Sequence, residues 1–206
     1  MRLLGIDPGV RNGAYVVLED GKVIHYGSWL NNSEGGTLHR SVEIISMLQL
    51  IFVMWRCEAV VTEEFFSPKG WKAGQFAAVN YQRGGFDLLF QATFGVVPMC
   101  IIHPRHLKKF ITNNGGANKD EMIPTIRKML ITRDPMWLLR LNGGSNEHVL
   151  EAWGLGMMGW HLWGWQNKPA LPLFQTDVLE QLKDAAWRPR CLDHAIQMPV
   201  FTKGWV

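Results

Sequence analysis

The stretch Leu3-Leu4-Gly5-Ile6-Asp7-Pro8-Gly9 joins a short, mostly apolar run to an acidic residue and a Pro-Gly pair. Such a run, stopped by a turn signal, is typical of a buried strand. We therefore expect a first strand that ends at Asp7. Strand-like segments follow at residues 14–18 and 23–29, with a hairpin connection at residues 19–22. The N-terminal part of the chain thus predicts an antiparallel meander of three strands.

Helical and strand-like patterns alternate after the meander. Residues 37–55 place apolar side chains at helical spacing, and Glu58 to Phe66 has the composition of a fourth strand. Further elements are expected as a helix over 74–94, a strand over 97–102, and helices over 104–112, 119–131 and 146–163, with a glycine-containing loop at 113–118. Prolines punctuate the region after Gly164, where a short helix is expected from about Asp177 to Trp187. This order predicts an α/β domain over residues 1–163 and a C-terminal appendage over 164–206.

Composition and charge narrow the class of protein. The 206 residues are 47% hydrophobic and 19% charged, which suits one globular domain with an appendage. The formal net charge is only +3, yet residues 65–142 hold 11 Lys and Arg against 4 acidic residues. A basic middle beside clustered carboxylates suits a polyanionic substrate held near bound cations. The alternative is a solvated basic face.

Cysteine usage and hydropathy favour an intracellular protein. Cys57, Cys100 and Cys191 are far apart and odd in number, so neither a disulfide framework nor a zinc spacing is present. Cys57 and Cys100 lie in or beside apolar runs, as buried thiols do. The apolar run from Ile44 to Trp55 is shorter than the 20 or so residues that a membrane span needs. We expect no membrane partner and a cytoplasmic location, in a bacterial or phage-infected cell.

Acidic residues stand where the predicted elements can bring them together. Asp7 closes the first strand, Glu63 and Glu64 lie near the end of the fourth, and Glu147, His148 and Glu151 occupy the first turns of the last long helix. Hydrolysis of a phosphodiester needs an activated water and stabilisation of charge on the phosphate, which two Mg²⁺ or Mn²⁺ ions can supply from carboxylate ligands. The sequence therefore indicates a metal site assembled from distant segments.

Each of these residues also has a structural interpretation. Asp7 before Pro-Gly can simply be a turn residue. Glu151 can be an acid placed near the positive end of the helix dipole, and His148 a surface residue of the first turn. Glu63 follows Val60-Val61-Thr62 in a strand that is otherwise apolar, where an unpaired carboxylate is costly. Glu64 points to the opposite face of the strand and is more easily solvated.

The opening Leu4-Gly5-Ile6-Asp7-Pro8-Gly9, followed by Gly13-Ala14-Tyr15, resembles the first strand and turn of the RuvC Holliday-junction resolvases. Residues 58–66 resemble the second acidic motif of that family, and the order of elements over residues 1–163 matches its RNase H-like fold. The resemblance implies a five-stranded mixed sheet flanked by helices. It also implies a metal-dependent endonuclease that cleaves four-way DNA junctions.

The resemblance assigns roles to individual residues. Asp7, Glu63, His148 and Glu151 would be the metal ligands, with Glu64 and Glu147 as additional candidates, and two Mg²⁺ ions per site, replaceable by Mn²⁺, would be the cofactor. Glu151 departs from the family, whose usual residue there is the shorter Asp. Lys108 and Lys119 would approach the scissile phosphate, with Lys119 counted among the catalytic residues. The DNA contacts would come from Phe66, Arg105, Lys108, Lys109 and Lys119.

Family members act as dimers, since a four-way junction has two symmetric cleavage points. The helix from Gly74 is therefore expected at a homodimer interface. Glu151 also supports an alternative in which the chain binds branched DNA but cleaves it weakly or not at all. A sugar-kinase-like ATPase is disfavoured, because the chain is short for two lobes and lacks a phosphate-binding Gly-Lys-Ser/Thr loop.

Overall fold

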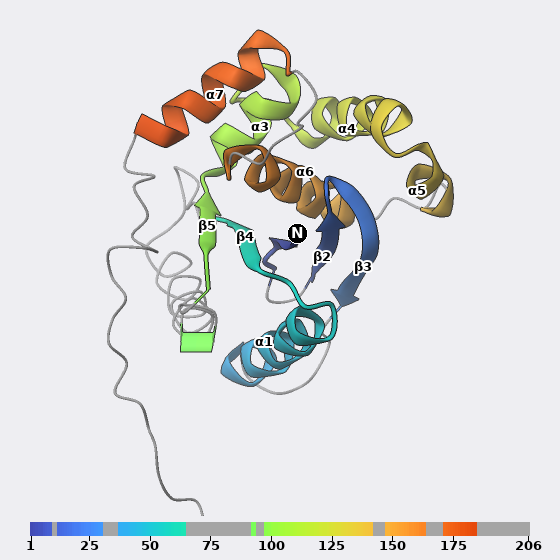
Figure 1. Cartoon of the computed structure of the whole chain (residues 1–206), viewed down its shortest axis with the longest axis vertical. Helices are drawn as coiled ribbons and strands as arrows, with labels where there is room; N and C mark the ends of the chain where they lie inside the picture. Colours follow the sequence, from blue (N-terminus) through green and yellow to red (C-terminus); the bar gives the residue numbers. More distant parts are fainter. Residues whose placement is uncertain are drawn as a thin grey trace, which may run out of the picture.

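The computed structural model describes residues 1–9, 12–30, 37–64, 92–93, 97–141, 147–163 and 171–184. A sheet of five strands lies at its centre, with the order β3-β2-β1-β4-β5 (Figure 1). The strands are β1 (Arg2–Asp7), β2 (Asn12–Glu19), β3 (Lys22–Leu30), β4 (Ala59–Glu63) and β5 (Met99–Ile102).

The sheet is mixed. β1, β2 and β3 form the predicted antiparallel meander, whereas β4 lies parallel to β1 and β5 lies parallel to β4. The register pairs Ile6 with Thr62, and Glu63 with Ile102. β1, β4 and β5 therefore end at one edge of the sheet, and α1 (Thr37–Met54) lies in the connection that carries the chain from β3 to β4.

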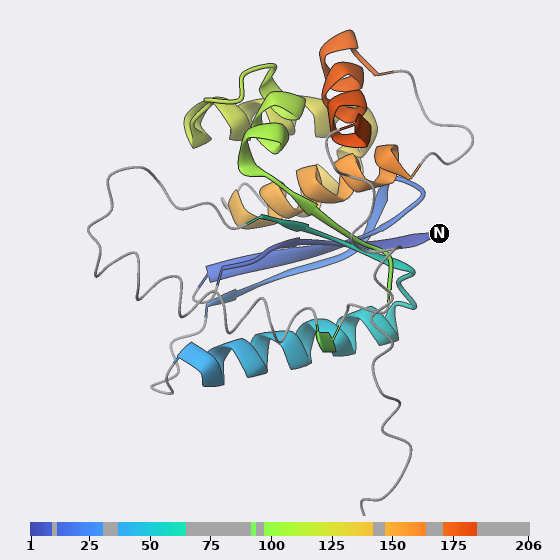
Figure 2. The same ribbon diagram turned by 90° about the vertical axis from the view of Figure 1, so that its left-hand side faces the viewer.

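Alternation along the strands divides the core between the two faces of the sheet. Leu4 and Ile6 point to one face, where they pack with Leu48 of α1. Leu3 points to the other face and packs with residues of α6 (Glu147–Leu162). Figure 2 shows α1 on one side of the sheet and α6, with the helices above it, on the other. By the same alternation, Asp7 belongs to the face covered by α6.

Glycines allow α6 to lie directly on the sheet. A Cβ atom added at Gly5 would lie 2.5 Å from the carbonyl oxygen of Ala152 and 3.0 Å from the Cα of Gly156. A Cβ at Gly159 would lie 2.2 Å from Cγ2 of Val61. Strand and helix backbones thus approach closely at these positions. As a consequence, the first turn of α6 lies over the end of β1.

Two helices follow β5 on the α6 side. α3 (Pro104–Thr112) begins with Pro104, which suits the first helical position because its missing N–H would have no intrahelical partner. α4 (Lys119–Arg133) begins with a capping box, in which the Asn118 side chain accepts from the Glu121 N–H and the Glu121 carboxylate accepts from the Asn118 N–H. This cap fixes the start of α4, where Lys119 is the first residue.

The C-terminal helix α7 (Leu173–Asp184) packs against α3 (Figure 1). Val178, Leu179 and Leu182 are buried in the same core as α6. Gln175 is buried, and its Nε2 donates to the main-chain carbonyl of Phe110 at 2.8 Å. That carbonyl lies in the last turn of α3, where helix carbonyls lack intrahelical partners. α7 therefore caps α3 from outside the helix.

Several predicted boundaries differ from the structure. β5 begins at Met99 rather than at residue 97, and α4 extends to Arg133 rather than Ile131. The tail helix begins at Leu173 rather than near residue 177. The short α5 (Pro135–Arg140) was not predicted, because six residues show too little periodicity to be recognised. The end of the predicted strand at residues 65–66 and most of the predicted helix over 74–94 lie outside the described residues.

Two other predictions concern the cysteines and the membrane. Cys57 and Cys100 are buried thiols, as expected, and burial raises the pKa of the Cys57 thiol to about 12. Among the helices that the structure describes, none combines the length and the apolar character that crossing a membrane requires.

Candidate active site

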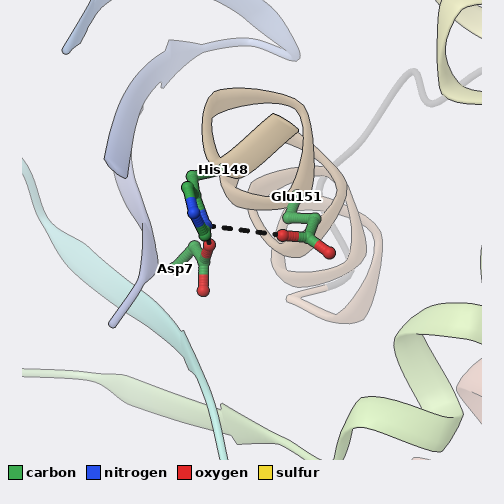
Figure 3. A group of neighbouring side chains, drawn as sticks. All are labelled: Asp7, His148 and Glu151. Atoms are coloured by element: carbon green, nitrogen blue, oxygen red, sulfur yellow. Dashed lines mark hydrogen bonds and ion pairs between the residues drawn. The ribbon is translucent and has the colours of Figure 1, made fainter. Parts of the chain in front are cut away.

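Asp7 lies at the end of β1, where the strand leaves the sheet. The turn that follows is tight, since the Gly9 N–H donates to the Asp7 carbonyl at 3.2 Å. The Asp7 side chain is 13% exposed and points toward the first turn of α6 (Figure 3). A carboxylate at such a depth is stable only with a partner of opposite charge or a metal ion.

His148 and Glu151 supply the other side of the site. They are three residues apart on α6 and so share one face of the helix. His148 Nδ1 lies 2.6 Å from Asp7 Oδ2 and 3.7 Å from Glu151 Oε2 (Figure 3). One ligand atom from each of the three residues falls within 4.8 Å of the others, the only such group of His, Cys, Asp and Glu side chains in the part of the chain that the structure describes.

This donor set fits a divalent cation. Two carboxylates and an imidazole converge, and the carboxylate oxygens suit Mg²⁺ and Mn²⁺. The imidazole nitrogen is a donor that first-row transition metals accept more readily than Mg²⁺ does. The 34% exposure of the His148 side chain leaves one side of the group open to a substrate.

Protons and a lysine balance the negative charge of the cluster. The hydrogen bond to Asp7 raises the pKa of His148 against the opposing effect of burial. Burial, followed by the charge of Asp7, raises the pKa of Glu151. Lys119 Nζ lies 3.0 Å from Glu151 Oε2 and 3.7 Å from Glu147 Oε2. Burial, the largest single effect, lowers the pKa of Lys119, but the carboxylates of Glu151, Asp7 and Glu147 together raise it above its usual value.

The structure brings together Asp7, His148, Glu151 and Lys119, four of the candidate residues named in the sequence analysis. Glu147 takes part only through its ion pair with Lys119. Glu63 ends β4 beside the end of β1, and strand alternation places it on the same face as Asp7. Its ligand atoms, however, do not join the group of three. Glu64 follows β4, and its N–H continues the pairing with β5 by donating to the Ile102 carbonyl at 2.7 Å.

The structure describes some of the residues that were predicted to contact DNA, but not all of them. Arg105, Lys108 and Lys109 all lie on α3, which follows the edge where β5 ends. Arg105 is exposed, and the two lysines are partly exposed. Phe66 lies outside the described residues.

One contact beside the site had no signal in the sequence. The indole Nε1 of Trp29, on β3, donates to the carbonyl of Gly9 at 2.7 Å. Trp29 is 20 residues from Gly9 in the chain, and only the strand register brings the two together. Gly5 was recognised as part of the first strand, but its role in admitting α6 requires the three-dimensional structure.

Comparisons with known proteins complete the description. No family model matches the chain. It is 30% identical to the "Crossover junction endodeoxyribonuclease RuvC" of Synechococcus sp. strain CC9605 over 140 residues, which span 66% of this chain and 87% of the relative. The protein of the same name from Synechococcus sp. strain CC9902 is also 30% identical, over 164 residues that span 78% and 98% of the two chains.

Among solved structures, that of Thermus thermophilus RuvC in complex with its Holliday junction substrate is similar, with a TM-score of 0.57 and 18% identity. The match covers 82% of this chain and 99% of the other. The five-stranded mixed sheet with helices on both faces is accordingly an RNase H-like fold of the resolvase type.

Proposed function

Because the chain belongs to the RuvC family of crossover junction endodeoxyribonucleases, we propose that it cleaves four-way (Holliday) DNA junctions by metal-dependent hydrolysis of phosphodiester bonds. The observation that carries the proposal is the convergence of Asp7, His148 and Glu151 at the end of β1. Asp7 is 141 positions from His148 in the chain, yet the three residues meet on a partly open surface. The DNA-bound state of the Thermus thermophilus relative supports a branched-DNA substrate.

Asp7, His148 and Glu151 would hold the metal. Mg²⁺, or Mn²⁺ in its place, would supply Lewis acidity toward a phosphate oxygen and would lower the pKa of a bound water. We propose two ions per site, with Glu63 as a further ligand beside Asp7. The parallel register of β1 and β4 supports this assignment, because it places Asp7 and Glu63 side by side at the ends of their strands and on the same face of the sheet.

The side chains have separate tasks in this scheme. Nδ1 of His148, which lies 2.6 Å from Asp7 Oδ2, would hold the metal in its neutral form, so metal binding would compete with this hydrogen bond. Lys119 holds Glu151 in place through the 3.0 Å ion pair, and its ammonium group is available to a phosphate at the same mouth of the site. The side chain of Glu151 is longer than that of Asp, the usual residue of the family. Its carboxylate is nevertheless held in position from two sides, by Lys119 and by His148.

We propose that Arg105, Lys108 and Lys109 of α3 contact the DNA backbone, together with Phe66 at an unpaired base. Contacts of this kind weaken with salt, because each phosphate neutralised releases counterions. A homodimer would present two active sites to the two symmetric strands of a junction. We place this activity in the cytoplasm, where recombining bacterial or phage DNA lies.

Asp7→Asn tests the proposal, because it keeps the side-chain volume but removes the charge. We expect cleavage of a synthetic four-way junction in Mg²⁺ to fall at least 100-fold, with junction binding in EDTA retained, since an amide is a poor metal ligand. Asp20→Asn is the matched control. The Asp20 side chain is 77% exposed on a hairpin and pairs with the N-terminal amine. We therefore expect the Asp20→Asn variant to cleave the junction at the normal rate. Cleavage by Asp7→Asn at the normal rate would refute the metal site.

A second function has specific support: binding of branched DNA with little or no cleavage. In the structure each acid already has a close partner: Asp7 Oδ2 lies 2.6 Å from His148 Nδ1, and Glu151 Oε2 lies 3.0 Å from Lys119 Nζ. Titration of the protein with Mg²⁺ and with Mn²⁺ on junction DNA separates the two functions. Tight binding without product at any metal concentration would favour the binding protein. Recovery of cleavage by Glu151→Asp would then show that the length of this side chain is responsible.

A further inference from the structure

The turn that follows Asp7 is held from the face of the sheet opposite to the active site. Trp29 lies on β3, two strands away from β1, and packs partly buried in the cluster beneath α1. Its indole Nε1 donates to the Gly9 carbonyl at 2.7 Å, within the usual range for a hydrogen bond of this kind. The side chain therefore reaches across β2 to the loop that carries Asp7.

Gly13 opens the path that the indole ring takes. The register of β2 and β3 pairs Gly13 with Trp29. A Cβ added at Gly13 would lie 2.3 Å from Cζ2 of the Trp29 ring and 2.6 Å from the Asp7 carbonyl oxygen. The ring thus covers the space that a side chain at position 13 would occupy. Only a glycine at this position allows the ring and the main chain of Asp7 to lie so close together.

A continuous series of hydrogen bonds runs from this contact to the metal ligands. Trp29 donates to the Gly9 carbonyl, the Gly9 N–H donates to the Asp7 carbonyl at 3.2 Å, and Asp7 Oδ2 is bonded to His148 Nδ1 at 2.6 Å. Gly9 is also confined on its other side, because an added Cβ would lie 1.6 Å from the Asn12 carbonyl oxygen. The turn is therefore fixed by its neighbours rather than by its own residues alone.

We propose that Trp29 is a positioning residue for the metal site: its bond to the Gly9 carbonyl holds the turn after β1, and through it the Asp7 carboxylate, in the arrangement that binds metal. The inference rests on the proposed function, because it concerns the same site. Trp29 touches neither metal nor DNA in this scheme. Its contribution is to reduce the freedom of Asp7 before the metal binds.

Trp29→Phe tests this role, since it keeps an aromatic ring and removes the N–H donor. Trp55→Phe is the matched control. Trp55 packs partly buried in the same cluster, and its indole N–H has no hydrogen-bond partner among the described residues. The two variants lose the same atoms from the same region, but only one of them loses a hydrogen bond.

We expect three results for Trp29→Phe relative to Trp55→Phe. Hydrogen exchange of the Gly9 amide in the metal-free protein becomes faster. The Mg²⁺ concentration for half-maximal cleavage rises about three- to tenfold, as expected for loss of one hydrogen bond. The rate at saturating Mg²⁺ and the affinity for junction DNA in EDTA stay within about twofold, since a single neutral hydrogen bond is at stake and no DNA contact is removed.

Equal exchange and equal Mg²⁺ dependence in the two variants would overturn the role of Trp29 while leaving the proposed function intact. If the unsubstituted protein failed to cleave junctions in Mg²⁺ or Mn²⁺, the proposed function would fail instead. Exchange at Gly9 would still decide whether Trp29 fixes the turn. A fall in junction affinity in EDTA as large as the change in Mg²⁺ dependence would indicate general damage and would also count against the proposal.

Discussion

Gly5→Ala should damage the active site from a position that touches none of its ligands. The added Cβ would meet the Ala152 carbonyl oxygen at 2.5 Å and the Gly156 Cα at 3.0 Å, both of them backbone atoms of α6. No side-chain rotation can relieve a clash with backbone. To restore ordinary contact, strand and helix must separate by about 1 Å, which is the scale of misplacement that costs a catalytic site about 100-fold in rate.

The effect on stability should be smaller than the effect on activity. Overpacking a core costs about 1–3 kcal/mol, whereas replacing a strand glycine by alanine recovers about 0.5–1 kcal/mol of backbone entropy. We therefore expect the free energy of unfolding to fall by about 1–2 kcal/mol, measured by urea denaturation. Cleavage of a four-way junction at saturating Mg²⁺ should fall about 100-fold, because α6 carries His148 and Glu151 away from Asp7.

Gly116→Ala is the control, because among the residues that the structure describes a Cβ there meets only Asn114 Oδ1, at 3.4 Å. It should leave both measurements close to those of the unsubstituted protein. The reasoning would be refuted if Gly5→Ala cleaved within twofold of the normal rate. Close contact between α6 and β1 would then not determine the geometry of the site.

Three further predictions follow from other contacts. Lys119→Met should reduce junction cleavage at least tenfold while changing DNA affinity in EDTA much less, because it removes the cation from the carboxylates of the site. The hydrogen bond to Asp7 raises the pKa of His148, so its contribution to stability is complete below the unfolded value of 6.5 and is lost as pH rises through the higher folded value. In EDTA, the difference in Tm between the protein and His148→Gln should therefore narrow from pH 5.5 to pH 9; a constant difference would contradict the assignment. Gln175→Ala should lower the free energy of unfolding by about 1–3 kcal/mol in urea denaturation, because the Phe110 carbonyl at 2.8 Å would be left buried without its donor. An unchanged unfolding midpoint would show that α7 is not needed to cap α3.

Local pattern was enough to predict the main elements of the fold. The apolar run before Asp7, the hairpin at residues 19–22 and the helical spacing of residues 37–55 each depend on neighbours in the chain, and the structure has all three elements. The short α5 lacked such a pattern, because six residues show too little periodicity; its start is capped by Asp134, whose side chain accepts from the Trp137 N–H. Asp134 also accepts from the Val23 N–H of β3 at 3.1 Å, a contact 111 positions away that no local rule contains.

The sequence named the candidate residues of the site but not the contacts between them. Asp7, His148 and Glu151 were expected as ligands, and the structure places them together. That Lys119 neutralises Glu151, and that the two are 3.0 Å apart, depends on how α4 approaches α6. The alternation of side chains along the strands predicts that Glu63 and Asp7 lie on the same face of the sheet. It does not predict the distance between their two carboxylates.

The hydrogen bond between Asp7 and His148 joins residues 141 positions apart. During synthesis, Asp7 leaves the ribosome long before α6 exists, and N-terminal segments can begin to fold while the rest of the chain is still being made. Such a nascent chain holds one acid of the site and none of its partners on the last helix. If Asp7, His148 and Glu151 form the metal site as proposed, a product that terminates before residue 148 has only one of these three ligands.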